Sequence, residues 1–430
     1  MKKIWKWLLA VVMTPLVLFV ALAVLLYLPP VQNWAVKQVA AYASEKTGMD
    51  ISVGHVSLVF PLDLCIDHFR MIQPNDSLPQ VKDTIADVQR LVVSVQLMPL
   101  FSQQVEIDAL DFSGLHLNTA NFVHEARVKA VVQRLYLTSH GINWAKETVR
   151  VDDALLQDAQ VSVELSDTVP PDTSKSENKW RITVDRLRVK STAVTLHMPG
   201  DTLQIAATLG DASVANGYFD LGKSLYQVKK FDWTKGSLAY DNRFKVKTKG
   251  LDVNHIALSD INVGIDSLDY SAPRLRMSLR QCSFKEKSGL TIDKITAKVD
   301  MDSLSIALPG LWISTPESHL RADVAMDFNA FDDRHPGQIS VVADGAFGKQ
   351  DIMRFLGGMP SAFVKSWPNQ PLTVKAVAKG NMKHLRLAGL NVKLPTAFNA
   401  NLRGTASHLA DLDRMQANLR LEANTQRLDF

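Results

Sequence analysis

The stretch at residues 105–117 reads VEIDALDFSGLHL, and its pattern decides the fold class. Apolar residues alternate with polar ones along it, but the phase of the alternation slips twice by one residue. Strict alternation predicts a β-sheet with one apolar and one polar face. A one-residue slip predicts a bulge or a tight turn between neighbouring strands.

The same pattern recurs along most of the chain, for example in Ile182–Leu196, Ile292–Ile306 and Met382–Leu394. No domain linker interrupts residues 49–430, although a single globular core seldom grows past about 250–300 residues. An elongated, repetitive sheet that grows strand by strand accommodates such a length. At about 13–15 residues per strand and turn, we expect about 25–30 strands.

Two stretches depart from the alternation. Ser166–Lys179 is polar and contains proline, which predicts a loop. Gln350–Trp367 predicts one or two short helices.

Composition narrows the class of protein. The hydrophobic fraction of 46% and the charged fraction of 21% are typical of a folded chain. The net charge of +4 is small and is not gathered into a patch, which argues against a nucleic-acid partner. Cys65 and Cys282 lack the spacing of metal ligands, so they are either two separate buried thiols or a pair formed in an oxidising compartment.

The N-terminal region predicts a membrane anchor. Three lysines before residue 8 precede an uncharged apolar run, Leu8–Leu28, which is long enough to cross about 30 Å of hydrocarbon as a helix. A cleavable signal peptide is the alternative, but its apolar region is usually shorter. Basic residues on one side place residues 1–7 in the cytoplasm and the bulk of the chain in the periplasm of a Gram-negative cell. The anchor positions are Leu8, Leu16, Phe19, Leu22 and Leu28.

A short amphipathic helix is predicted within residues 29–48. Apolar residues recur at helical spacing from Val31 to Thr47, and Gly48 is placed to cap the helix. The helix would lie on the membrane surface or pack on the end of the β-domain, which occupies residues 49–430.

The chain carries one match to a catalytic motif. Gly217–Ser224 satisfies the P-loop pattern G-x-x-x-x-G-K-S, but its intervening residues are bulky or acidic, and no helix is predicted after it. A turn between strands is the better interpretation. The histidines are scattered and Asp332–Gly337 is typical of a polar turn, so we expect neither an enzyme nor a metal or cofactor site.

The feature with functional content is the apolar face of the predicted sheet. It either closes into sandwiches or curls into a trough whose interior stays partly open. An open trough beside a membrane anchor would hold lipid tails, because each buried CH₂ group gains about 0.8 kcal/mol. The candidate lining positions are Val105, Ile107, Phe112, Leu115, Ile182, Val184, Ile261, Val263, Ile292 and Val299.

Several segments of this chain resemble the TamB and AsmA-like family. The anchor and the following helix lead into Thr47–Gly54 and Val56–Pro61, as in the opening of that family. The Ile107–Leu117 stretch and Trp367–Leu372, with the apolar alternation after it, are also similar. The family's motifs are apolar patterns that carry no catalytic residue.

The resemblance implies a taco-shaped β-groove for bridge-like transport of phospholipid between inner and outer membrane. It also implies a role in outer-membrane biogenesis with an outer-membrane β-barrel partner. TamB proteins are longer and end in a further domain, so this chain is expected to be an N-terminal portion. The alternative function is a scaffold or assembly factor for outer-membrane β-barrel proteins, in which sheet edges take up unfolded strands.

Overall fold

The computed structural model describes residues 29–59, 63–74, 82–95, 107–119, 126–143, 146–165, 179–248, 250–332, 334–356, 360–409 and 413–426. The predicted anchor Leu8–Leu28, the segment before it and Val105 lie outside these ranges. Within them, no helix combines the length and the apolar character that crossing a membrane requires.

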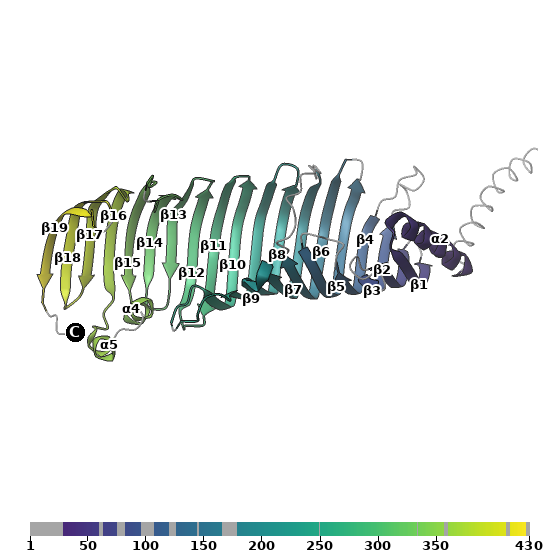
Figure 1. Cartoon of the computed structure of the whole chain (residues 1–430), viewed down its shortest axis with the longest axis horizontal. Coiled ribbons are helices and arrows are strands. Elements are labelled where there is room, and N and C mark those ends of the chain that lie inside the picture. Colours follow the sequence, from purple (N-terminus) through teal and green to yellow (C-terminus); the bar gives the residue numbers. More distant parts are fainter. Residues whose placement is uncertain are drawn as a thin grey trace, which may run out of the picture. The chain divides into compact units, whose positions relative to one another are not determined.

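The described chain is mainly β, with nineteen strands assigned to one open antiparallel sheet. The chain divides into two compact units, which are described separately: unit 1 comprises residues 1–173 and 190–199, and unit 2 comprises residues 174–189 and 200–430. The strand β7 (Arg181–His197) contributes residues to both. In each unit, strands that are consecutive in the chain lie side by side (Figure 1).

Unit 1 contains β1 (Asp50–Val59), β2 (Asp63–Pro74), β3 (Lys82–Val95), β4 (Ile107–Asn118), β5 (Ala126–Asn143) and β6 (Thr148–Leu165). Unit 2 contains β8 (Leu203–Asp220), β9 (Leu225–Asn242), β10 (His255–Ser271), β11 (Arg274–Glu286), β12 (Thr291–Met301), β13 (Ser305–Ser314), β14 (His319–Asp327), β15 (Ile339–Phe347), β16 (Leu372–Asn381), β17 (His384–Leu394), β18 (Phe398–Ser407) and β19 (Gln416–Thr425).

The strands of unit 1 share a line of residues that the strand pairing leaves out without a shift in register. On β4, the pairing with β5 runs through Ser113 and Leu115 but omits Gly114. The neighbouring strands omit one residue at the same level, so their register is kept while each strand changes the phase of its alternation. The omitted residues, which we call the bulge line, are Gly54, His68, Gln89, Gly114, Gln133 and Asp158.

The bulge line explains the phase slip and the strand count. The slip at Gly114 lies inside a strand, at a residue of positive φ that the pairing leaves out, and not in a turn between two strands. Strands therefore run on through the slips, and four of them reach 18 residues. The described residues accordingly form nineteen strands, fewer than the pattern predicts.

The polar face of the sheet carries cross-strand ion pairs in each unit. In unit 1, Arg134 lies 3.0 Å from Asp111 and Arg70 lies 2.9 Å from Asp87. In unit 2, Arg280 lies 2.9 Å from Asp266 on the neighbouring strand. Each of these exposed pairs adds little stability, but opposite charges on adjacent strands favour the observed register.

Three α-helices lie within the described residues. The helix α2 (Pro29–Thr47) ends at Gly48, whose φ of 69° and N–H bond to the Ser44 carbonyl cap it as predicted. It packs against β1, but its apolar residues are spread around the helix with little bias to one face, and Trp34 is 65% exposed. The helices α4 (Lys349–Leu356) and α5 (Ser361–Ser366) occupy the region where short helices are expected.

Candidate functional site: an apolar face on each unit

The backbone register of unit 1 aligns apolar side chains across six strands. Phe112 on β4 pairs with Leu91 and Leu135, whose own partners are Ile66 and Leu156. Three further levels of the sheet repeat this arrangement, so every one of the twenty-four positions is apolar. The four rows are Leu58–Leu64–Val93–Leu110–Leu137–Ala154, Val56–Ile66–Leu91–Phe112–Leu135–Leu156, Val53–Phe69–Val88–Leu115–Val132–Ala159 and Ile51–Met71–Ala86–Leu117–Ala130–Val161.

The bulge line keeps these rows on one face. Without a slip, Phe112 and Leu115 would point to opposite sides of the sheet, because side chains alternate with a period of two. Leu115 packs against Val132 and Ala159, as do Leu135 and Leu156 from the other side of the bulge line. The apolar surface is therefore continuous across it.

The residues that alternate with the row members along each strand form a polar face. The level between the Phe112 row and the bulge line reads His55–Asp67–Arg90–Ser113–Arg134–Gln157. The two faces of unit 1 thus differ sharply in polarity, as the alternation predicts.

Unit 2 carries an apolar face of the same kind over twelve strands. Two of its rows run from β8 to β19 with no polar member other than two tyrosines and one cysteine. These rows are Ala212–Trp233–Val263–Cys282–Ile295–Ile313–Leu320–Gly345–Val374–Val392–Ala400–Ala423 and Phe219–Tyr226–Tyr270–Leu275–Met301–Ile306–Met326–Ile339–Gly380–Leu385–Ala406–Ala417.

Cys282 belongs to this face as an apolar group. Burial raises the pKa of its thiol, which keeps the side chain uncharged. Cys65 is buried on the opposite, polar-facing phase of β2, and both cysteines are free thiols.

The apolar faces are packed but not sealed. In a closed core, large apolar side chains are almost completely buried. Among the described residues, however, no Phe, Tyr or Trp side chain is buried, and the largest fully buried side chains are Leu394, Val56 and Val88. Most members of the rows are half-buried.

The predicted lining positions whose pairing partners are known lie on these apolar faces. Phe112 and Leu115 belong to the rows of unit 1, and Val263 belongs to a row of unit 2. Val299 pairs with Met277, and Ile292 pairs with Phe284, two residues from Cys282. Ile107 pairs with Val95 at the start of β4, and Ile261 is buried two residues from Val263. Ile182 and Val184 are half-buried on β7.

Sequence reasoning missed most members of the rows. Trp233 of a row, and Phe231 and Tyr240 on the same face beside the rows, lie among lysines and aspartates, so the alternation around them is weak. Their places on this face follow from pairing with Val263, Ile265 and Ile256, which only the register reveals.

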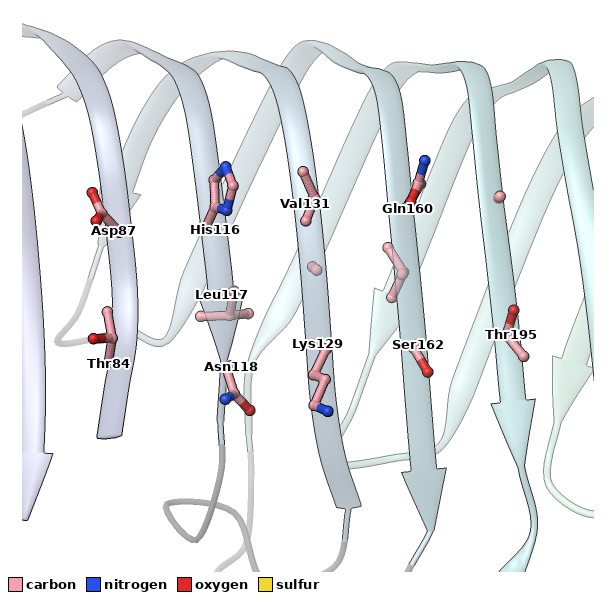
Figure 2. Close-up of a pocket in the computed structure, with 13 residues that line it drawn as sticks. Thr84, Asp87, His116, Leu117, Asn118, Lys129, Val131, Gln160, Ser162 and Thr195 are labelled. Carbon is pink, nitrogen blue, oxygen red and sulfur yellow. The ribbon is translucent and has the colours of Figure 1, made fainter. Parts of the chain in front are cut away.

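A hollow of about 570 Å³ lies in unit 1 (Figure 2). Its lining includes Asp87, His116 and Gln160 from one level and Asn118, Lys129 and Ser162 from another. Both levels are out of phase with Leu117 and belong to the polar face. The lining also includes Leu117, Ala130 and Val161, which belong to an apolar row of unit 1, so the hollow shares residues with the predicted apolar site.

The catalytic motif match is a turn. Gly217 to Asp220 end β8, β9 begins at Leu225, and no helix follows the motif. The Lys223 N–H donates to the Asp220 side chain within the turn. Among the residues that the structure describes, no three His, Cys, Asp or Glu side chains are grouped so that they could hold a metal ion.

Comparison with known proteins found no family model that matches the chain and no similar curated protein.

Proposed function

We propose that the protein carries phospholipid, with the acyl chains lying on the apolar face of its sheet. The observation that carries the proposal is the register-aligned set of apolar rows, most of whose side chains remain partly exposed. Each CH₂ group that such a surface removes from water gains about 0.8 kcal/mol, so an acyl chain gains many times that. A polar headgroup would stay in water beyond the rows.

The cellular setting of this proposal comes from the sequence. Leu8–Leu28 would anchor the chain in the inner membrane, with residues 1–7 in the cytoplasm and the sheet in the periplasm. The resemblance to the TamB and AsmA-like family supports bridge-like transport towards the outer membrane with a β-barrel partner there. A sheet of nineteen strands without a described second layer is consistent with the taco-like form of that family.

A charge on the apolar face tests the proposal. Val263→Asp should reduce the phospholipid that the full-length protein retains, because a carboxylate is expensive to bury beside an acyl chain. The matched control is Gln281→Asp, since Gln281 is an exposed polar-face neighbour of Cys282, the pairing partner of Val263.

Retained phospholipid is measured by mass spectrometry, and folding is checked by circular dichroism. A folded Val263→Asp protein that retains as much lipid as the control would contradict the proposal. A photocrosslinker at position 263 then separates the two functions: lipid adducts support transport, whereas polypeptide adducts support the assembly factor.

A further inference from the structure

The connection between β9 and β10 carries exposed apolar and basic residues in alternation. Its first part, residues 243–248, reads RFKVKT, and we call residues 243–247 the basic loop. Phe244 is 72% exposed and Val246 is 86% exposed, and the three cationic residues between and beside them are exposed as well. Val253, later in the same connection, is 67% exposed.

Acidic residues flank the basic loop but do not lie within it: Asp241 precedes it and lies 3.4 Å from the His255 ring. Between Asn242 and Leu251 there is no acidic residue. The next carboxylate, Asp252, is buried and turned inward, where it accepts hydrogen bonds from the Thr248 and Asn254 N–H groups and contacts His255 at 2.9 Å. The basic loop therefore presents a local positive charge to solvent.

The fold holds the basic loop in place. The Arg243 N–H donates to the Thr202 carbonyl at 3.1 Å, and the Phe244 N–H donates to the Asn242 side chain at 3.2 Å. At the end of β9, directly before the basic loop, the Asn242 N–H donates to the Asn254 carbonyl at 2.9 Å. These hydrogen bonds fix the start of the connection in the conformation in which Phe244 and Val246 are exposed.

We propose that the basic loop docks onto an anionic lipid bilayer. Exposed aromatic and aliphatic side chains that alternate with Lys and Arg match the boundary between acyl chains and phosphate groups. There Phe244 and Val246 would enter the apolar layer while Arg243, Lys245 and Lys247 meet the phosphates. A nucleic acid would use the charges but would leave the apolar tips in water.

The experiment reports the environment of the basic loop itself. Membrane insertion of the predicted N-terminal anchor therefore does not contribute to the signal. Full-length protein with Cys65→Ser and Cys282→Ser receives Val246→Cys, which is labelled with an environment-sensitive fluorophore. The protein is placed in nanodiscs of zwitterionic lipid, and vesicles with about one third phosphatidylglycerol are added. The control label is at Leu304→Cys, because Leu304 is 73% exposed in a turn beside Asp302.

We expect a blue-shifted, stronger emission at position 246 with anionic vesicles, reduced by salt, and no change at position 304. Lys245→Gln with Lys247→Gln should weaken vesicle binding about 25-fold at low salt, since each cation contributes roughly a factor of five. An unchanged emission at position 246, an equal response to zwitterionic vesicles, an equal response at position 304, or a response only to a polyanion such as heparin would each overturn the proposal.

Discussion

At the scale of single residues, the bulge line depends on backbone conformations that few side chains tolerate. Gly114 has a φ of 63°, and a Cβ atom there would lie 2.5 Å from the Gln89 side chain. Gly114→Ala should lower the free energy of unfolding by about 1–2 kcal/mol, mainly because a left-handed backbone disfavours a Cβ. Denaturant titration measures the change.

Gly389→Ala is the matched control, because Gly389 also lies in a strand but a Cβ there would meet nothing within 4 Å. Its substitution should raise the free energy of unfolding by up to about 1 kcal/mol, because Ala loses less backbone entropy on folding than Gly. Adding Gln89→Ala to Gly114→Ala separates the two causes. If the pair regained the full stability, the strain would be steric and our account of the backbone would be wrong.

Asp252 makes the stability of the fold around the basic loop depend on pH. The Thr248 N–H, the His255 ring and the Asn254 N–H bind its carboxylate and hold its pKa well below the ordinary value, against the opposing effect of burial. A lowered pKa stabilises the fold above the unfolded value of about 4, and this contribution is lost as the pH falls through the folded value.

Asp252→Asn should therefore destabilise the protein at pH 7 and flatten the fall in stability below about pH 4. Urea midpoints measured from pH 7 to pH 2 test this. Identical slopes for the two proteins in the acidic range would show that Asp252 is not linked to folding.

At the scale of elements, α4 is held by a buried carboxylate. Asp351 is 3% exposed and accepts hydrogen bonds from the Thr315 and Ser318 hydroxyl groups and from Arg354, the last at 3.0 Å. Asp351→Ala should cost about 2–3 kcal/mol, because it leaves buried donors without an acceptor. Hydrogen exchange of the backbone amides of α4 should be faster in this variant.

The matched control is Asp344→Ala, which removes an exposed carboxylate 3.1 Å from Lys375. An exposed pair contributes less than about 1 kcal/mol, so this change should be mild. Equal losses for the two variants would refute the role of the buried network.

Much of the element structure could be predicted from the sequence, and the failures have physical causes. The slip at residues 113–114 predicts a bulge or a turn, and alternation alone cannot choose between them, because both shift the phase by one residue. Gly114 and Asp158 adopt positive φ within strands, so strands continue where turns were possible. The short helices were indicated by the loss of alternation.

At the scale of the whole molecule, the apolar face could be predicted but its extent could not. Phe112, Leu115 and Val263 were identified because they alternate with polar neighbours. Trp233 was not, because its stretch is rich in lysine and aspartate and its place is set by pairing with Val263. Register joins residues far apart in sequence, and no local pattern encodes it.

The central claim is that the apolar face is open to acyl chains in phase with the observed register. A photocrosslinking scan along β17 tests it, because this strand changes phase between Leu387 and Leu390. Crosslinkers are placed singly at residues 385–393 of the full-length protein, and lipid adducts are counted by mass spectrometry. We predict adducts at residues 385, 387, 390 and 392, with few at 386, 391 and 393. Equal labelling at every position, or no lipid adducts at the four apolar ones, would contradict the account.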